Sequence, residues 1–249
     1  MSGLYNAIIF NPLYNALIGL FTVFPWADAG VAVILLTIIV RLILFPLSRK
    51  AVLTQVRMQE IAPALEEIKQ KHKDNSEEQA RQTLALYKER GVNPFSGVLV
   101  LLIQLPIIFA LYRIFLHAGF PNVDITLLYS FIHAPLSINT MFLGLDITKK
   151  SVVLALLAAL STFFQLKFAA QYARQNKTKD ATSSFGNDLA ENMQTQMKYV
   201  FPFIVFFISY KISGVIALYW LTSNLFTIGQ EIVVRRKIQQ VQKIQAKLN

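Results

Sequence analysis

One arginine, Arg41, stands inside an apolar run of the sequence, LLTIIVRLILFPL at residues 35–47. A charged side chain deep in a membrane span costs about 2.5–3.5 kcal/mol on insertion scales, so it normally faces a protein interior or a water-filled cavity. Arg41 could extend along about 9 Å of helix toward the polar residues that begin at Ser48, pair with an acid, or be hydrated. Because Glu231 is the only acid in the predicted spans and stands at the far end of the last one, hydration in a groove is favoured.

Polar residues recur at helical spacing in the last apolar run, where they mark one face. They are Trp220, Ser223, Asn224, Thr227, Gln230 and Glu231. Residues of these types also join membrane helices through ordinary interhelical hydrogen bonds. Together with an arginine that lacks a nearby acid, the set favours a hydrophilic groove over simple helix association. The candidate groove residues are Arg41, Thr37, Gln104, Gln165, Trp220, Ser223, Asn224 and Thr227.

Enzyme chemistry has little support in the sequence. Cysteine is absent, which excludes disulfides, thiolate metal sites and cysteine nucleophiles. His72, His117 and His133 show no H-E-x-x-H pairing for zinc, and no Gly-x-Ser-x-Gly turn or phosphate-binding glycine loop is present. Ser48 and Lys50 are two residues apart and do not face each other on a helix. We therefore expect no catalytic residue, no cofactor and no metal.

The composition identifies the chain as an integral membrane protein. Of its 249 residues 54% are hydrophobic and only 15% are charged, and the mean hydropathy is +0.46. The fold class expected is an all-α membrane protein with five transmembrane helices. Apolar runs bounded by charges or turn residues place these spans at roughly 29–47, 95–112, 151–166, 199–210 and 213–233.

Lysine and arginine are distributed unevenly between the segments that separate these spans. Residues 48–95 hold nine, 167–198 hold five and 234–249 hold five, whereas the other side holds only four. Because basic residues accumulate on the cytoplasmic side, we expect the N-terminus outside and the C-terminus in the cytoplasm.

The chain divides into four predicted parts. Residues 1–27 form an interfacial helix on the outer leaflet, since Asn6, Asn11, Pro12 and Asn15 interrupt its apolar sequence; a sixth span is the alternative. Residues 28–51 form the first span, 52–94 a cytoplasmic helical hairpin, and 95–249 the other four spans with a cytoplasmic loop and a basic C-terminal tail.

Periodicity and capping signals carry the prediction of the hairpin. Met58, Ile61, Leu65 and Ile68 are spaced as the apolar face of one amphipathic helix. Ser76, with Gln79 three residues on, forms a capping box for a second helix, and Gly91 ends it. An antiparallel hairpin outside the membrane follows, either as a binding element or as a plain solvated connector.

Three further features are read from spacing and composition. Sixteen residues separate Lys150 from Lys167 and twelve separate Lys198 from Lys211, so these spans are short, and either the lysines snorkel or the bilayer thins around them. Loop 171–197 is rich in Asn, Thr, Ser and Gln and is predicted to be unstructured. The tail RRKIQQVQKIQAKLN is basic and could contact ribosomal RNA or anionic lipid, or serve only as a positive-inside anchor.

Four segments, in this order, resemble the YidC membrane protein insertase family. They are TIIVRLILFPLSRK, RMQEIAPALEEIKQKHK, LALYKERGVNPFSGVLVLLIQLPIIFALYRIF and LYWLTSNLFTIGQEIVVRRK. The resemblance extends from about residue 5 to residue 240. It implies the minimal five-span form without the large periplasmic domain, located as a multi-pass protein in a bacterial inner or plasma membrane. The lipoprotein cysteine of many members is absent.

The resemblance also implies a mechanism and partners. Arg41 would lie in a groove open to the cytoplasm and to lipid, through which the polar tail of a newly made membrane protein crosses. The implied partners are nascent membrane proteins and the lipid bilayer, with the ribosome and targeting factors at the hairpin and basic tail, and a Sec translocon. The alternative functions are a small anion transporter or channel that binds its anion at Arg41, and an assembly factor without a translocating role.

Overall fold

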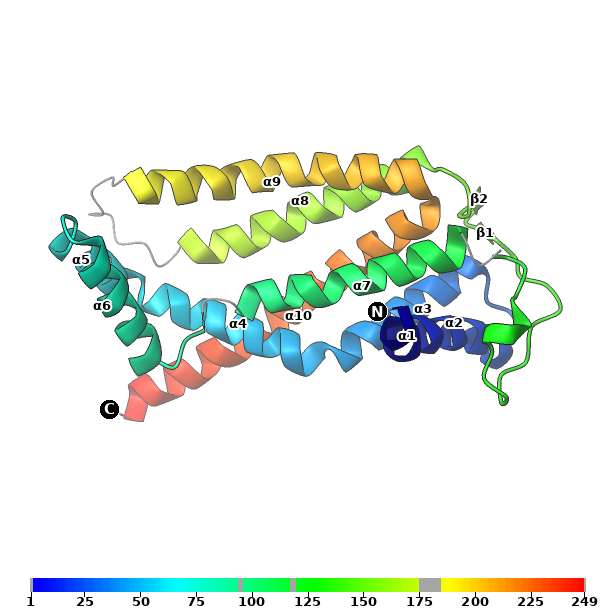
Figure 1. Cartoon of the computed structure of the whole chain (residues 1–249), viewed down its shortest axis with the longest axis horizontal. Helices are drawn as coiled ribbons and strands as arrows, with labels where there is room; N and C mark the ends of the chain where they lie inside the picture. Colours follow the sequence, from blue (N-terminus) through cyan, green and yellow to red (C-terminus); the bar gives the residue numbers. More distant parts are fainter. Residues whose placement is uncertain (1, 94–95, 117–119, 175–184, 249) are drawn as a thin grey trace.

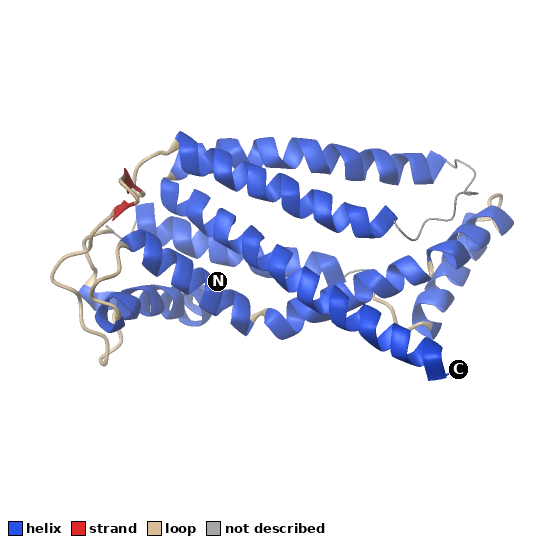
Figure 2. Cartoon of the chain, turned by 180° about the vertical axis from the view of Figure 1, so that it is seen from behind, coloured by secondary structure: helices blue, strands red, loops and turns tan. Residues whose placement is uncertain are grey.

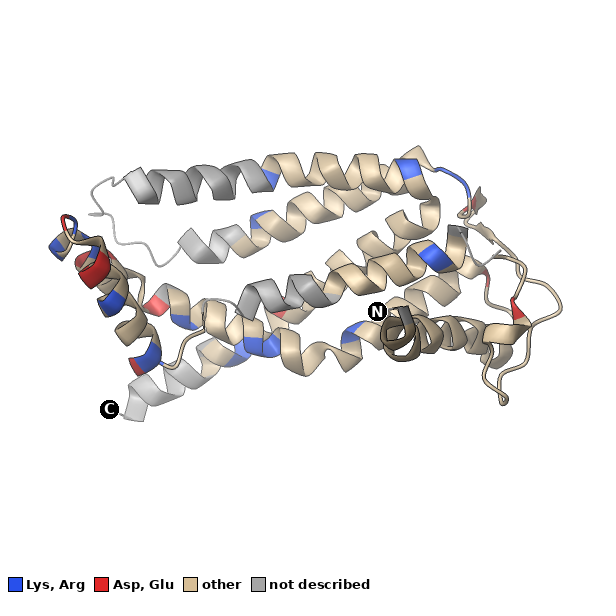
Figure 3. Ribbon diagram, in the orientation of Figure 1, with Lys and Arg blue, Asp and Glu red and all other residues tan. Residues whose placement is uncertain are grey.

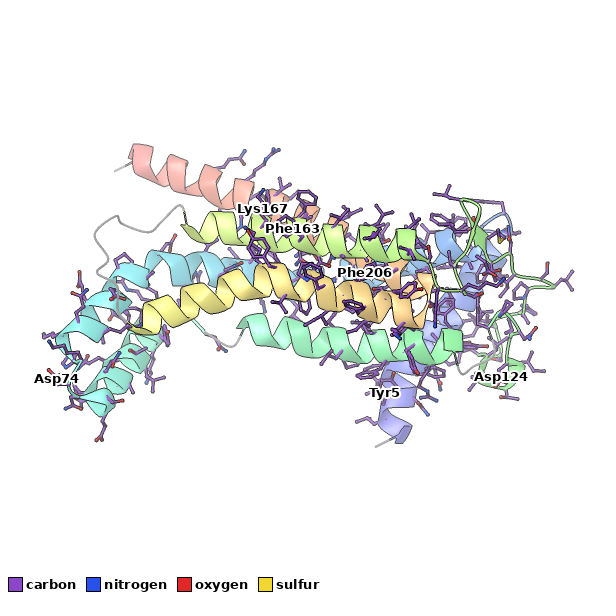
Figure 4. All side chains as sticks on the ribbon, turned by 90° about the horizontal axis from the view of Figure 1, so that it is seen from above. Tyr5, Asp74, Asp124, Phe163, Lys167 and Phe206 are labelled. Atoms are coloured by element: carbon purple, nitrogen blue, oxygen red, sulfur yellow. The ribbon has the colours of Figure 1, made fainter. Side chains whose placement is uncertain are left out.

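Most helices in this computed structural model run along one long axis, with a helical hairpin at one end and an irregular loop at the other (Figure 1). The structure describes residues 2–93, 96–116, 120–174 and 185–248. A short two-stranded sheet, β1 (Met141–Phe142) and β2 (Leu145–Asp146), lies in the irregular loop (Figure 2). We call the two ends of the molecule the hairpin end and the strand end. Asp74 and Asp124 mark these opposite ends in Figure 4.

The N-terminal segment crosses the bundle instead of running along it (Figure 4). It consists of α1 (Ser2–Tyr5), a π-helical turn η1 (Asn6–Phe10) and α2 (Asn11–Val23). One face of α2 is buried through Tyr14, Leu17 and Ile18. Asn15 fixes the strand-end loop on it, since its side chain donates to the Leu127 carbonyl at 2.8 Å and accepts from the Tyr129 amide at 2.6 Å.

The first predicted span, 29–47, is broken in the structure. Helix α3 (Ala29–Ile43) ends at Leu44, and α4 (Phe45–Glu60) leaves at an angle of 61°. Pro46 explains the break, because it has no amide hydrogen for the Leu42 carbonyl and its ring clashes with that carbonyl in a continuous helix. The predicted span therefore consists of two helices that meet at an angle just after Arg41.

Two helices, α5 (Ala62–Lys71) and α6 (Ser76–Glu89), occupy most of the segment predicted as a hairpin and lean across the end of the bundle (Figure 1). The prediction of one helix through Met58, Ile61, Leu65 and Ile68 was wrong, because α4 ends at Glu60 and Ile61 lies at the turn before α5. Ile61, Leu86 and Val92 form the small core of the hairpin. Ser76 was predicted to cap α6, and this was wrong: the Asn75 side chain accepts the Glu78 amide at 3.0 Å. Gly91 ends the helix as predicted, with φ +60.

Four long helices form the rest of the bundle. They are α7 (Ser96–Leu116), α8 (Val152–Arg174), α9 (Phe185–Ile212) and α10 (Gly214–Leu248). The main core draws side chains from α2, α3 and α7–α10, and it is concentrated toward the strand end. There the start of α10 is held by backbone bonds, since the amides of Gly214 and Val215 donate to the carbonyls of Lys149 and Ile147 at 2.8 and 2.9 Å.

Length and hydropathy single out fewer spans than the sequence predicts. Among the described residues, Gly3–Val23 and Val152–Ala169 are long and apolar enough to cross a membrane, and the bent pair α3–α4 is a third candidate. Gln104–Phe115 is a shorter apolar helix. The chain is thus an all-α membrane protein, while the number of spans and their orientation stay predictions.

The loop predicted at 171–197 is largely helical where it is described. Helix α8 continues to Arg174 and α9 begins at Phe185, while residues 175–184 lie outside the described part. The composition misled here, because Leu, Ala, Glu, Met and Gln between 189 and 197 are good helix formers and outweigh the Asn and Thr residues among them.

Gly30 permits close packing of the strand end on α3. A Cβ atom at this position would overlap the Phe142 ring and lie 2.6 Å from the Phe142 Cβ. We expect Gly30→Ala to destabilise the protein by about 1–3 kcal/mol, as overpacking does elsewhere. Thermal unfolding in detergent measures this effect. Gly229→Ala is the matched control: nothing lies within 4 Å of that position, so the added methyl should be neutral or stabilising. Equal effects of the two substitutions would contradict the packing argument.

Candidate functional site

Arg41 lies in the last turn of α3 and is bonded to a neutral partner. Its Nε donates to the Ser223 hydroxyl of α10 at 2.8 Å, and its Nη2 reaches the same oxygen. The side chain is partly buried between α3 and α10. Within the described part of the chain, no carboxylate lies in salt-bridge distance of Arg41. A guanidinium carries five N–H donors, so one hydroxyl leaves much of its capacity for another ligand.

The hydrogen-bonded group extends from Arg41 to α7. Gln104 of α7 donates to the Tyr219 hydroxyl, and that hydroxyl lies beside Ser223. Tyr219 is 2% exposed, one turn before Ser223 on α10. Arg41, Ser223, Tyr219 and Gln104 therefore form one polar cluster that joins α3, α10 and α7. We call these four residues the Arg41 cluster.

Two candidate threonines lie beside this cluster and bond to their own helices. Thr37, one turn before Arg41, is 2% exposed and donates to the Val33 carbonyl at 2.6 Å. Thr227 donates to the Ser223 carbonyl at 2.8 Å. Their hydroxyl oxygens can still accept a hydrogen bond.

Asn224 belongs to a different contact. Its amide nitrogen donates to the hydroxyls of Ser161 and Thr162 on α8, at 2.9 and 2.8 Å, and all three residues are buried. Asn224 therefore joins α10 to α8 in the manner of an interhelical hydrogen bond. Gln165 follows about one turn later on α8, and Trp220 packs against the main core; both are partly buried. The structure thus brings Arg41, Thr37, Gln104, Ser223 and Thr227 together, and it places Asn224 on the α8 side.

Tyr219 was not among the residues predicted for the site. In the sequence it stands between Leu218 and Trp220 and looks like part of the apolar face. A buried tyrosine normally needs a partner for its hydroxyl. The position of Tyr219, one turn before Ser223, was the available signal, and it would have linked Gln104 to the polar face of the last apolar run.

Polar contacts also fix α10 to α4 nearer the hairpin end. Gln230 donates to the Ser48 hydroxyl at 2.7 Å. Glu231 and Arg235 form a buried ion pair at 2.6 Å, and Arg235 also donates to the Gln55 side-chain oxygen at 3.2 Å. Gln230 and Glu231, the last two residues of the predicted polar face, are therefore engaged in contacts that hold α10 against α4.

Charged residues are numerous in the hairpin and occur at scattered positions along the described parts of the bundle helices (Figure 3). The hairpin carries both signs, and on α6 the hydrogen bonds from Arg81 and Gln82 lower the pKa of the Glu78 carboxyl. Lys167 belongs to α8 and Lys198 to α9. Near them the ring centroids of Phe163 on α8 and Tyr199 on α9 are 5.9 Å apart. Arg41 differs from these charged residues, because its hydrogen-bonding neighbours in the Arg41 cluster are polar but uncharged.

The Arg41 cluster offers donors and a positive charge, and no reactive group. Among the described residues no set of three His, Asp or Glu side chains could hold a metal ion. A charge held by neutral partners in a partly buried position suits the binding of anionic or polar groups. The fold and this cluster together define an all-α membrane protein with a polar site inside its helical bundle.

Comparison with known proteins identifies the family. Residues 20–243 match the family described as 60Kd inner membrane protein. A membrane protein insertase YidC from Clostridium tetani is 30% identical over 237 residues, which cover 95% of both chains. One from Oceanobacillus iheyensis is 30% identical over 239 residues, covering 94% of this chain and 84% of the relative. One from Wolinella succinogenes is 30% identical over 211 residues, covering 84% of this chain and 34% of that longer relative. The chain belongs to the YidC membrane protein insertase family.

Proposed function

We propose that this protein inserts newly made membrane proteins into a bacterial inner or plasma membrane and helps them to fold. The family supports this function, since its members compared above are named insertases and it is not a family of catalytic enzymes. The clients are nascent membrane proteins. The site of action is a hydrophilic groove that opens to the cytoplasm and is centred on Arg41.

The observation that supports this site most directly is the neutral environment of Arg41. Its charge meets a serine hydroxyl, and the next groups along the cluster are a tyrosine hydroxyl and an amide. An internal carboxylate would have cancelled the charge and competed with a client. A cation with free donors can instead attract an acidic or polar segment that leaves water.

The orientation follows from the distribution of basic residues. With the hairpin end in the cytoplasm, 19 of the 24 lysines and arginines face the side that favours them. In this orientation α1, η1 and α2 lie at the outer leaflet, and the packed strand end closes the groove toward the outside. Five membrane spans are then the bent helix α3–α4 and the helices α7, α8, α9 and α10.

The physical gain for a client is a lower barrier. An unpaired peptide group costs about 4–8 kcal/mol to transfer into a fully apolar medium, so even partial hydration along the path removes a large part of the cost. The short apolar stretches of α8 and α9 would thin the bilayer and shorten the path. A client's polar tail would pass the Arg41 cluster while its apolar segment moves along the first and third spans, α3–α4 and α8, into lipid.

Two regions provide contacts for delivery of clients. The hairpin α5–α6 lies at the mouth of the groove and could receive the ribosome or targeting factors. The end of α10, rich in basic residues from Arg235 onward, could contact ribosomal RNA or anionic lipid. Delivery of clients through the hairpin or through the basic end of α10 is also compatible with action beside a Sec translocon.

Reconstitution of the purified protein alone in liposomes tests the function. We expect a single-span client with a short polar tail to become inserted, so that an external protease cleaves only the exposed end and the span stays protected. Empty liposomes and liposomes with an unrelated helical membrane protein are the controls. Failure with several clients, together with anion flux that depends on Arg41, would assign the protein to the alternative class of small anion transporters or channels.

A further inference from the structure

A cavity lies between α4 and α10 at the hairpin end, away from the Arg41 cluster. It measures about 400 Å³, within the range of small-molecule sites in proteins. Leu53 and Val56 of α4 and Val233 of α10 line it with aliphatic side chains, and we call these three residues the aliphatic floor. Val233 is 49% exposed, so this part of the lining is open to the surroundings of the protein.

Basic side chains surround the aliphatic floor. Arg49 and Arg57 of α4 and Lys237 of α10 line the cavity, and all three are exposed. Of the described residues that line it, Glu60 is the one carboxylate. The cavity therefore combines an apolar floor with a rim whose net charge is positive.

The two walls are held in place by side-chain contacts. The bonds from Gln230 to Ser48 and from Arg235 to Gln55 connect α10 with α4 directly. Glu231 fixes the Arg235 guanidinium within α10. The gap between the helices is thus a preformed feature, and an occupant need not order the walls when it binds.

The chemistry of the lining selects among possible occupants. A polypeptide would bring backbone N–H and C=O groups onto an aliphatic floor that cannot bond them, at a cost for each unsatisfied group. An acyl chain has no such groups, and a phosphate group suits clustered arginine and lysine side chains. Basic pockets between helices on the cytoplasmic side of a membrane are recognised sites for anionic lipid headgroups.

We infer that this cavity binds an anionic phospholipid, with its phosphate between Arg49, Arg57 and Lys237 and part of an acyl chain on the floor. The assignment does not depend on the Arg41 cluster or on insertion of clients. It rests on the cavity, its charge and the clamped helix pair, together with the proposed orientation that places the hairpin end in the cytoplasm.

Lipid binding to the whole, delipidated protein in detergent tests the inference. Phosphatidylglycerol and phosphatidylcholine with identical acyl chains are added separately, and bound lipid is counted by native mass spectrometry while thermal unfolding is followed. We expect phosphatidylglycerol to bind at least tenfold more tightly and to raise the unfolding temperature in a concentration-dependent way. The double variant Arg49→Gln/Lys237→Gln should lose about tenfold in affinity for phosphatidylglycerol.

A charge-matched variant separates a site from general attraction. Lys150→Gln/Lys211→Gln removes two exposed lysines at the strand end, and its lipid affinity should change less than twofold. Equal binding of both lipids, or equal losses in both double variants, would overturn the inference. Stabilisation by millimolar inorganic phosphate to the same extent would show a site for free phosphate instead. Displacement of the lipid by a polyglutamate peptide would assign the cavity to an acidic polypeptide.

Discussion

Arg41→Ala should lower the insertion of clients with acidic tails by about tenfold, and the insertion of clients with uncharged tails by much less. A tenfold effect corresponds to about 1.4 kcal/mol. Two unit charges 4 Å apart interact by about 4 kcal/mol at the effective dielectric of a protein surface, so the expected loss is a modest part of the available attraction. The measurement is the fraction of each client protected from protease in liposomes.

The controls for this prediction distinguish charge from hydration. Arg41→Lys keeps the positive charge and should retain most activity on clients with acidic tails. Arg41→Gln removes the charge and keeps hydrogen-bonding groups at this position. Lys211→Ala removes an exposed cation at the strand end and should leave insertion unchanged. If Arg41→Ala depressed both classes of client equally, attraction of acidic tails would be refuted, and a role in hydrating the groove would be left.

Labelling of a cysteine at position 41 tests hydration by itself. The chain contains no cysteine, so Arg41→Cys introduces a single thiol. A membrane-impermeant maleimide added to the cytoplasmic side should label it, and the same reagent added outside should not. Protection from both sides would contradict a groove open to the cytoplasm.

The positions of the helices were largely predictable from hydropathy. In a bilayer every backbone polar group must be satisfied within the segment, so a long apolar run bounded by charges has one regular conformation available. Residues 96–112, 152–166, 199–210 and 214–233 of the predicted runs fall within helices, and the interruption after Lys211 coincides with the junction of α9 and α10. The all-α class followed from the same constraint.

Helix boundaries that depend on local competition were not predictable. Asn75 and Ser76 are adjacent and both are good N-cap residues, so the choice between them depends on backbone geometry at the turn. The break at Leu44 was signalled by Pro46, yet a proline in the first turn of a helix and a proline that kinks one look alike in sequence.

The polar residue types on the polar face of α10 were easier to predict from the sequence than the neighbouring helix that each side chain contacts. A periodic pattern shows that Ser223 and Asn224 belong to the same broad face of α10, but the two side chains differ by about 100° around the helix. In the structure that angle directs Ser223 to α3 and Asn224 to α8. Which neighbour each side meets depends on tertiary packing, and no spacing within α10 encodes it.

Breaking the ion pair between Glu231 and Arg235 should have the largest effect on stability. Both side chains are only 6% exposed, and the pair supports the contact of α10 with Gln55 of α4. We expect Glu231→Gln to destabilise the protein by about 3–5 kcal/mol, because a buried guanidinium would lose its carboxylate. Thermal unfolding in detergent measures the loss.

Two comparisons decide whether burial of charge causes this effect. In the double variant Glu231→Leu/Arg235→Met no charge stays buried, so most of the lost stability should return. The pair between Glu78 and Arg81 has side chains that are 26% and 74% exposed, and Glu78→Gln should destabilise the protein far less, because water screens this pair. If Glu231→Gln were as mild as Glu78→Gln, water would have to reach the pair, and the contact between α4 and α10 would be far more open than its geometry indicates.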